Sequence, residues 1–346
     1  MDKKDEIILQ QLETIRTMTE RNLRSMGGDF WGTPFENVTG APEKKPASKD
    51  GGGKPAAAQP AEKKADEPEP LPKENLADLQ AELDSYIGLA DVKEEVKNLI
   101  NMVNVYKLRR AHDLPTTDMS LHMVFTGNPG TGKTMMARMM ARIYRSLDIL
   151  SKGQLVEVDR SGLVAGYVGQ TALKTQKVIE KAMGGVLFID EAYALNGKSE
   201  NDFGQEAIDT ILKAMEDHRD DLGVIVAGYT DLMEKFIHSN PGLESRFNRF
   251  LLFEDYSPDE MLAIFRMQCK KGCYQLAEGT EELVRDYINE ENGDPETFGN
   301  ARGVRNCFEH ILVAQNNRLA AMESVTKDDL MTIIPDDVLY ARGKLD

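Results

Sequence analysis

Residues 127–134, Gly-Asn-Pro-Gly-Thr-Gly-Lys-Thr, have the residue types and the spacing of a phosphate-binding loop. Glycines let backbone N–H groups turn inward around phosphate oxygens, and a helix that begins here adds the partial positive charge of its N-terminus. Lys133 is placed to reach the β- and γ-phosphates of ATP, and Thr134 to bind Mg²⁺. The pattern predicts ATP and Mg²⁺ as ligands, with contacts from Asn128, Pro129, Gly130, Thr131, Gly132, Lys133 and Thr134.

An apolar run that ends in two carboxylates follows further along the chain. Residues 186–189 read as a buried strand, and Asp190 and Glu191 come directly after it. Asp190 is placed to hold Mg²⁺ through water, and Glu191 to activate the water that attacks the γ-phosphate. An aspartate at such a turn can instead cap the next helix. Beside the phosphate-binding loop, the hydrolytic interpretation is the stronger one.

Phosphoryl transfer also requires positive charge at the transferred group, and two segments supply arginines. Arg246 and Arg249 lie just before the last predicted strand, and Arg302 and Arg305 lie at the start of a predicted helix. Arg302 and Arg305 are three residues apart and would share a helix face. A single arginine is more often solvated or ion-paired than catalytic. The residues alone therefore leave all four open.

The elements that must position these side chains follow from the hydropathy pattern. Strand-like apolar runs alternate with helical segments, which predicts an α/β fold with a parallel sheet covered by helices. Beyond Tyr256 no strand is expected, because residues 257–260 have the pattern of a helix N-terminus and the rest reads as helical. The expected strands are 123–126, 155–158, 186–189, 224–227 and 250–253. We expect a nucleotide-binding α/β domain at 75–256 with a five-stranded parallel sheet, and a small all-α lid domain at 257–346.

The first 74 residues are predicted to lie outside these two domains. Residues 1–28 carry apolar side chains mostly three or four residues apart, which is typical of an amphipathic helix. Residues 29–74 are rich in Pro, Gly, Ala, Lys and Glu, which is typical of a flexible linker. A tethered apolar helix suits recruitment of a protein substrate or adaptor, or pairing with its own copies as a coiled coil.

The composition restricts the partners. A formal net charge of −16 argues against wrapping nucleic acid. The three cysteines have no metal-ligand spacing and indicate a reducing cytoplasm. No stretch approaches the roughly 20 apolar residues that span a bilayer. We expect a cytoplasmic protein with no membrane span, no metal apart from the nucleotide's Mg²⁺, and no nucleic-acid partner.

With these motifs in order, residues 83–342 resemble the AAA+ ATPases. Within them the chain resembles the CbxX/CfqX family, which includes red-type rubisco activases and sporulation- and secretion-associated ATPases. The marks are the phosphate-binding loop together with residues 86–89, 184–195, 203–208 and 227–230. The resemblance implies a homo-oligomeric ring, a hexamer, that hydrolyses ATP.

The resemblance also implies roles for single residues. Ile87 and Gly88 would lie beside the adenine. Arg246 would act as a finger on the next subunit's nucleotide and Arg302 would sense phosphate from the lid, with Arg249 and Arg305 in reserve. Many AAA+ proteins place asparagine after the fourth strand, where this chain has Thr230, whose hydroxyl would orient water.

Residues 166–169, Gly-Tyr-Val-Gly, resemble the aromatic pore loop of hexameric AAA+ unfoldases. Tyr167 and Val168 would then grip an extended polypeptide. Without the family, a turn whose tyrosine packs inward would be the preferred interpretation.

The expected function is therefore a ring-forming ATPase that remodels or threads a protein substrate through a central pore. Two other classes stay open, because clamp loaders, helicase loaders and branch-migration motors share this ATPase core, and because ATP could merely toggle assembly of a scaffold. Rubisco is the best-known target of the family, but the segment before Asn75 is longer than such an activase requires.

Overall fold

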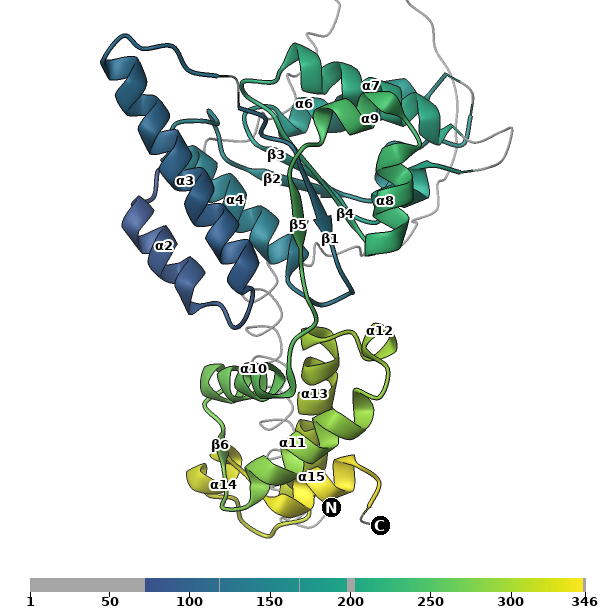
Figure 1. Cartoon of the computed structure of the whole chain (residues 1–346). Coiled ribbons are helices and arrows are strands. Elements are labelled where there is room, and N and C mark those ends of the chain that lie inside the picture. The colour runs from purple at the N-terminus through teal and green to yellow at the C-terminus, as the bar shows by residue number, and fades with distance from the viewer. Residues whose placement is uncertain (1–71, 118, 168, 198–202, 345–346) are drawn as a thin grey trace, which may run out of the picture.

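A computed structural model describes residues 72–117, 119–167, 169–197 and 203–344. The predicted N-terminal helix, most of the predicted linker, and Val168 lie outside the described residues. Figure 1 shows two bodies, a sheet domain with helices on both faces and a smaller helical lid below it. The chain crosses from one to the other at the end of the last strand of the sheet.

The sheet is five-stranded and entirely parallel, as expected, with the order β2-β3-β4-β1-β5. Strands β1, β3 and β4 are apolar and buried throughout, because helices cover both of their faces. The prediction of five strands is confirmed, although β4 is one residue longer at each end and β5 one residue shorter. Their bounds are β1 Met123–Thr126, β2 Leu155–Val158, β3 Val186–Ile189, β4 Gly223–Gly228 and β5 Phe250–Leu252.

Side chains alternate across the sheet and fill two separate cores. Phe125 and Phe188 pack against α2 (Leu76–Ser85), α3 (Ala90–Ala111) and α4 (Lys133–Ser146). Val124 and Leu187 point to the other face. That face is covered by α6 (Thr171–Ala182), α7 (Gly204–Asp217), α8 (Thr230–His238) and α9 (Pro241–Arg246). The carboxyl ends of the strands meet at one edge, where ligands bind in open α/β sheets.

Two short helices complete this domain. Helix α5 (Arg160–Leu163) follows β2, and the 3₁₀ turn η1 (Ala192–Leu195) follows β3. Among the described residues, no helix combines the length and apolarity needed to cross a bilayer.

The lid is helical, with one correction. Its helices are α10 (Pro258–Lys271), α11 (Thr280–Glu291), α12 (Pro295–Phe298), α13 (Ala301–Ala320), α14 (Lys327–Met331) and α15 (Pro335–Ala341). The expectation that no strand follows Tyr256 is wrong, because β6 (Gln275–Leu276) pairs in parallel with β7 (Thr332–Ile333). Strands of two residues are too short to carry an alternating pattern.

Helix α10 begins with the capping box that the pattern of residues 257–260 predicts. Ser257 caps α10 by accepting from the Glu260 backbone N–H, and the Glu260 carboxylate accepts from the Ser257 backbone N–H. Pro258 occupies the first helical turn. This capping box turns the chain away from β5 and fixes the start of the lid.

Candidate nucleotide site

The phosphate-binding loop joins β1 to α4, and three of its glycines adopt backbone angles that disfavour any other residue. The φ angles of Gly127, Gly130 and Gly132 are 138°, 71° and 98°. A Cβ at Gly127 would lie 2.2 Å from the Phe253 carbonyl oxygen, and one at Gly130 would lie 2.1 Å from that of Gly299. The loop is therefore enclosed by β5 on one side and by the lid on the other.

Lys133 is the first residue of α4 and folds back over the loop. Its Nζ donates to the carbonyl oxygens of Gly127 and Asn128, at 2.7 Å each. Burial lowers the pKa of Lys133 to about 8, and the positive charge of Arg302 acts in the same direction, while Asp190 opposes both. The ammonium group is thus held at the site where a phosphate would bind, with a carboxylate nearby to balance its charge.

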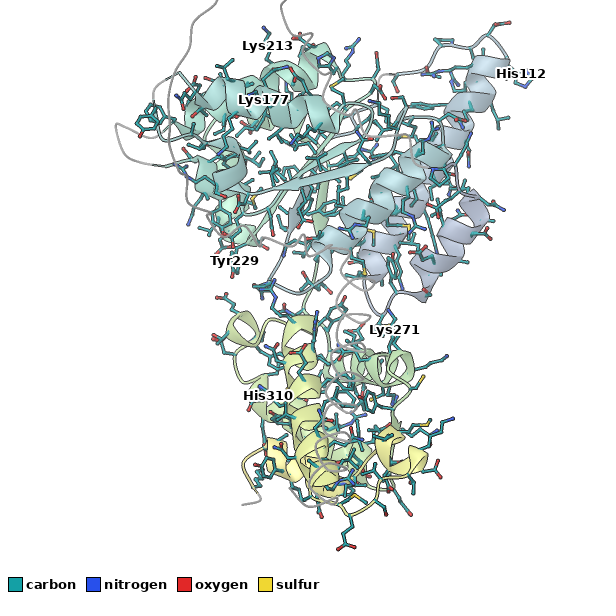
Figure 2. The ribbon with its side chains drawn as sticks, turned by 180° about the vertical axis from the view of Figure 1, so that it is seen from behind. His112, Lys177, Lys213, Tyr229, Lys271 and His310 are labelled. Atoms are coloured by element: carbon teal, nitrogen blue, oxygen red, sulfur yellow. The ribbon has the colours of Figure 1, made fainter. Side chains whose placement is uncertain are left out.

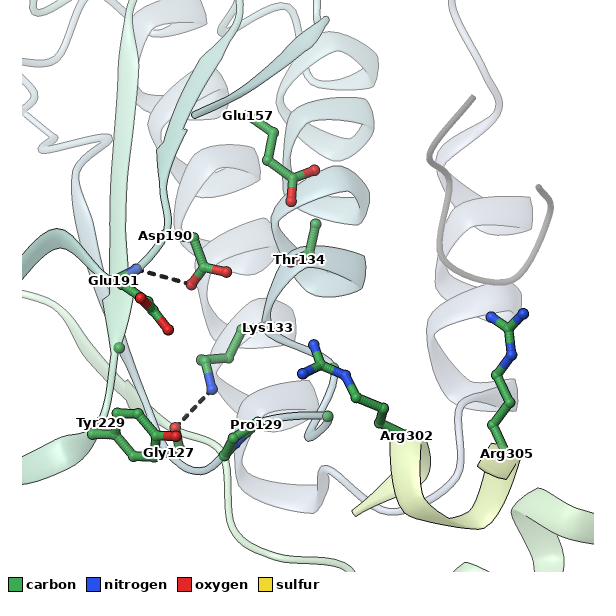
Figure 3. Close-up of a pocket in the computed structure, with 13 residues that line it drawn as sticks. Gly127, Pro129, Lys133, Thr134, Glu157, Asp190, Glu191, Tyr229, Arg302 and Arg305 are labelled. Carbon is green, nitrogen blue, oxygen red and sulfur yellow. Dashed lines mark hydrogen bonds between the residues drawn. The ribbon is translucent and has the colours of Figure 1, made fainter. Parts of the chain in front are cut away.

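A pocket of about 410 Å³ gathers side chains from both domains around this lysine (Figure 3). Its lining comes from the phosphate-binding loop, the ends of β2, β3 and β4, and the first turn of α13. The members are Gly127, Pro129, Gly130, Gly132, Lys133, Thr134, Glu157, Asp190, Glu191, Gly228, Tyr229, Arg302 and Arg305. The motifs that the sequence separates thus converge on one pocket.

The two acids after β3 adopt different conformations. The Asp190 carboxylate accepts a hydrogen bond from the Glu191 backbone N–H at 3.0 Å. Glu191 itself is left-handed, with φ 47° and ψ 42°, which is uncommon for a residue with a Cβ. Figure 3 shows both carboxylates facing the pocket beside Lys133. The turn thereby presents two adjacent acids to one space, as metal binding and water activation require.

The residues present fit Mg²⁺ bound together with a nucleotide. Magnesium usually takes one or two protein ligands and completes its shell with phosphate oxygens and water. Thr134 and Asp190 line the same pocket and supply a hydroxyl and a carboxylate. The described residues contain no cluster of three or more His, Cys, Asp and Glu side chains that would hold a metal alone. The site therefore fits magnesium as a companion of the phosphates.

Both candidate lid arginines reach the pocket from the start of α13. Figure 3 shows Arg302 extending toward Lys133. Arg305 donates from Nε to Glu309 at 2.8 Å, so its charge is partly neutralised within its own helix. Of the two, Arg302 is better placed to contact a terminal phosphate.

A buried asparagine that the sequence analysis did not single out ties the lid to the loop. Asn300 is fully buried, and its Nδ2 donates to Asp255 at 2.8 Å and to the Pro129 carbonyl at 3.3 Å. Its Oδ1 accepts from the Tyr256 backbone N–H at 2.9 Å. Asn128 donates to the same Asp255 carboxylate. This network joins the two domains across the pocket.

A second, more apolar hollow of about 350 Å³ adjoins the first. Ile87 lines it, together with Tyr86, Met135, Tyr256 and Ala301 among others. A Cβ at Gly132 would contact Met135 and Tyr256, so the loop residue Gly132 separates the two hollows. Charged side chains of Glu82, Arg138, Arg142 and Lys271 also line it, but its larger apolar share suits a nucleobase whose phosphates lie in the first pocket.

Two predicted residues lie beside these hollows rather than in them. Gly88 does not line the second hollow; it has φ 63°, and a Cβ there would lie 2.7 Å from Glu260 Oε1. Thr230 is exposed in the first turn of α8 and does not line the phosphate pocket. The preceding Tyr229 lines it instead, and Figure 2 shows that Tyr229 lies at the lid-facing edge of the sheet domain, far from Lys177 and Lys213.

Glu157 is a further pocket residue that the sequence analysis missed. It lies near the end of β2, and partial burial raises the pKa of its carboxyl, with the Asp190 charge adding to the effect and Arg138 opposing it. The sequence feature that could have identified Glu157 is a carboxylate near the carboxyl end of a parallel strand, where ligands bind in such sheets.

The candidate finger arginines lie outside their own subunit's pocket. Arg246 ends α9, and its Nη2 lies 3.2 Å from the Glu216 carboxylate. Arg249 contacts the Met102 sulfur at 3.6 Å. The structure therefore does not bring either side chain to the phosphate pocket of the same chain.

The Tyr167 loop, residues 164–170, lies between α5 and α6, away from the pocket lining. The Tyr167 side chain is 74% exposed. A Cβ built at Gly166 or Gly169 would have nothing within 4 Å. The alternative of an inward-packed tyrosine does not hold in this structure.

Comparisons with known proteins agree with this arrangement. Residues 123–255 match the model of the ATPase family associated with various cellular activities (AAA), and residues 257–345 match the AAA lid domain. The chain is 43% identical over 274 residues to a CfxQ homolog of Guillardia theta, which covers 78% of this chain and 93% of that protein. It is 44% identical over 272 residues to the chloroplastic ribulose bisphosphate carboxylase/oxygenase activase of Cyanidioschyzon merolae, covering 78% and 92%.

A third relative is the stage V sporulation protein K of Bacillus subtilis, 40% identical over 265 residues, covering 76% of this chain and 82% of that protein. Among solved structures, a point mutant of RuvB from Thermotoga maritima matches with a TM-score of 0.51 at 18% identity, covering 75% of this chain and 71% of that one. At that identity the likeness shows a shared fold.

Proposed function

Because the chain belongs to the AAA family of ATPases, among the relatives of CfxQ and CbxX, we propose that it forms a hexameric ring that remodels a protein substrate through the Tyr167 loop. The observation that carries the proposal is the composition of the phosphate pocket. It unites Lys133, Asp190, Glu191 and Arg302, but no candidate finger arginine of its own chain. Such a pocket binds and turns over ATP, and a neighbour would complete it.

The proposed chemistry is distributed among a few side chains. Lys133 binds the β- and γ-phosphates, and Thr134 and Asp190 hold Mg²⁺, which supplies charge neutralisation when bound. Glu191 accepts the proton of the attacking water. Arg302 contacts the γ-phosphate from the lid, so loss of that phosphate releases a contact between the domains. Thr230 does not line the pocket and has no part in this proposed chemistry.

The proposed ring follows from where Arg246 lies. Arg246 ends α9, which precedes the edge strand β5 in the sequence, and its side chain pairs with Glu216 of α7 and does not line the pocket of its own chain. An arginine finger supplied in trans acts on the nucleotide of a neighbouring subunit. In a closed ring each Arg246 would face the next nucleotide, which makes hydrolysis depend on assembly.

The proposed grip on substrate rests on the exposure of Tyr167. A large aromatic side chain that is 74% exposed between glycines without neighbours contributes little to the fold. Exposed aromatic groups of this kind are typical of binding surfaces. One relative is named as an activase of ribulose bisphosphate carboxylase/oxygenase and another for sporulation. For this chain we propose a protein substrate or adaptor that is recruited through residues 1–28.

A two-stage experiment tests the proposal. The Glu191→Gln variant should bind ATP without turning it over, so that partners trapped on it are recovered from cells and identified by mass spectrometry. The recovered partner then serves as substrate for the Tyr167→Ala and Tyr167→Phe variants. We expect Tyr167→Ala to keep ATP turnover within about twofold, the range of a surface change outside the pocket, and to lose remodelling. Tyr167→Phe should keep both activities.

Remodelling that survives in Tyr167→Ala would contradict the threading mechanism. DNA-stimulated ATP turnover at moderate salt would favour a nucleic-acid motor instead. Slow ATP hydrolysis, together with an oligomeric state that changes only with ATP binding, would favour a nucleotide-controlled scaffold.

A further inference from the structure

Glu191 forms a wall between the phosphate pocket and another hollow. It lines the pocket described above and also a hollow of about 440 Å³ on the side of the Tyr167 loop. The other walls of that hollow include Arg160, Ala165, Gly166 and Ala194. The water-activating acid and the base of the substrate loop therefore border one space. A movement of the Glu191 turn has a short path to the loop.

Arg160 connects the two sides of this hollow. It is the first residue of α5, and its Nη1 donates to the Ala194 carbonyl oxygen in η1 at 2.5 Å. The turn η1 begins directly after Glu191, which precedes it in the left-handed conformation. A displacement of Glu191 therefore moves the carbonyl that Arg160 holds.

The Arg160 guanidinium also lies close to the start of α7. A Cβ at Gly204, where α7 begins, would lie 1.9 Å from the Leu195 carbonyl oxygen and 3.1 Å from Arg160 Nη1. The Arg160 guanidinium therefore lies beside both the end of η1 and the start of α7.

From α5 the connection continues to the base of the loop. Lys174 of α6 donates to the carbonyl oxygens of Ser161 and Val164, at 2.5 and 3.0 Å. The Thr171 hydroxyl accepts from the Ala165 backbone N–H at 3.1 Å. Both ends of the loop are therefore fixed to α5 and α6. Between these ends, a Cβ built at Gly166 or Gly169 would have no atom within 4 Å. The position of Tyr167 therefore depends on where α5 and α6 hold the two ends of the loop.

We propose that Arg160 is a positioning residue that couples the Glu191 turn to the Tyr167 loop, so that the state of the nucleotide sets where Tyr167 lies. This inference rests on the proposed function, because it assigns the loop the substrate-binding role. It adds the connection by which hydrolysis reaches the loop. The coupling includes the hydrogen bond from Arg160 to the Ala194 carbonyl oxygen, which a lysine side chain can partly replace.

Hydrogen exchange of the full chain, measured by mass spectrometry without any substrate, tests the coupling. Exchange is compared with no nucleotide and with Mg²⁺ and a non-hydrolysable ATP analogue. We expect the peptide that covers residues 164–170 to change its exchange rate at least twofold on nucleotide binding. Arg160→Ala should abolish that change while the peptide covering residues 127–134 keeps its protection. Arg160→Lys should restore part of the change.

Arg285→Ala is the matched control. Arg285 forms an exposed ion pair with Asp259 on the lid at 2.6 Å, and its removal should leave both peptides unchanged. The inference is overturned if the loop of the parent chain does not respond to nucleotide, or if Arg160→Ala keeps the full response. It is also overturned if Arg160→Ala loses protection at residues 127–134, because Arg160 would then support the fold generally.

The two proposals fail separately. A loop that responds to nucleotide through Arg160 but whose Tyr167→Ala variant still remodels substrate would leave the coupling intact and remove the threading function. If Arg160→Ala keeps the full response of the loop to nucleotide while Tyr167→Ala loses remodelling, only the coupling through Arg160 is ruled out.

Discussion

The phosphate-binding loop and the Tyr167 loop are both rich in glycine, but the surroundings of their glycines differ. A Cβ at Gly127 or Gly130 would lie about 2 Å from a backbone carbonyl oxygen, at 2.2 and 2.1 Å. A Cβ at Gly166 or Gly169 would meet nothing within 4 Å. In the first loop glycine permits close approach of the backbone to the lid and to β5. In the second loop, glycines with open space around them flank the exposed side chain of Tyr167.

The difference separates two requirements of an ATP-driven machine. The phosphate pocket needs preorganised donors, so its loop is held by both domains and by the buried Asn300. In the proposed function the Tyr167 loop adapts to an extended polypeptide, and its described residues are tied to α6 through Val164 and Ala165 at its start. Substitutions should therefore affect folding and nucleotide binding in the first loop and substrate handling in the second.

The largest expected effect comes from adding one methyl group to the phosphate-binding loop. Gly130→Ala places a Cβ against the Gly299 carbonyl oxygen in a backbone with φ 71°. We expect the affinity for a fluorescent ATP analogue to fall at least ~100-fold, because a strained and displaced backbone typically costs about 3 kcal/mol. The paired change Gly166→Ala should leave affinity and unfolding midpoint unchanged. Equal effects of the two changes would show that the contrast between the loops is wrong.

Removal of the buried amide between lid and loop should have the next largest effect. Asn300→Ala leaves the Tyr256 backbone N–H without its acceptor. An unsatisfied buried polar group costs about 1–3 kcal/mol, so we expect ATP affinity to fall roughly tenfold and the unfolding midpoint to drop. Asn306→Ala, an exposed position in the same helix, is the control. Isothermal titration calorimetry of both variants measures the difference.

The free energy of unfolding should depend on pH through a buried histidine of the sheet domain. His122 is buried before β1, its Nδ1 accepts from the Val224 backbone N–H at 3.1 Å, and burial lowers its pKa to about 4. Between pH 6.5 and 4 the unfolded chain takes up a proton that the folded chain refuses, so stability is lost as pH falls. We expect this group to remove about 2 kcal/mol of unfolding free energy between pH 7 and 5.

His122→Asn keeps an acceptor but does not titrate. Urea unfolding at both pH values should therefore show a flatter pH dependence for this variant than for the parent chain. Identical slopes would mean that His122 does not contribute to the pH dependence.

The smallest expected effect on stability is that of Tyr167→Ala. Because the ring is largely exposed and its loop has open space on both sides, the free energy of unfolding should change by no more than about 0.5 kcal/mol. Tyr144→Ala supplies the contrast, since Tyr144 is fully buried in the first core and its truncation should cost about 3–5 kcal/mol. A large loss of stability in Tyr167→Ala would indicate that the ring packs inward after all.

Most of the fold was predictable from the sequence because buried parallel strands are continuous apolar runs. Residues 123–126, 155–158 and 186–189 were placed without error for this reason. The pair β6 and β7 was not predicted, since each strand has only two residues. Their pairing depends on contacts between segments more than fifty residues apart, which no local pattern reports.

The pocket was predictable where chemistry demands a fixed spacing. Lys133, Asp190 and Glu191 follow from motifs, whereas Asn300, Glu157 and Tyr229 act through contacts that form only in the folded chain. The family pattern points to Thr230 because it expects a polar residue directly after the fourth strand. The strand extends to Gly228 and α8 begins at Thr230, which leaves Tyr229 at the pocket.

The central claim is that ATP in the pocket places the Tyr167 loop on a polypeptide. A photoreactive benzoylphenylalanine at position 167 of the Glu191→Gln chain tests it most directly, with a carboxymethylated, permanently unfolded polypeptide as the probe. The same group at position 313, which is exposed on the lid, is the control. We expect a crosslink from position 167 that requires ATP and disappears when Lys133→Ala is added. No crosslink from position 167 with ATP, or an equal crosslink without nucleotide, would contradict it.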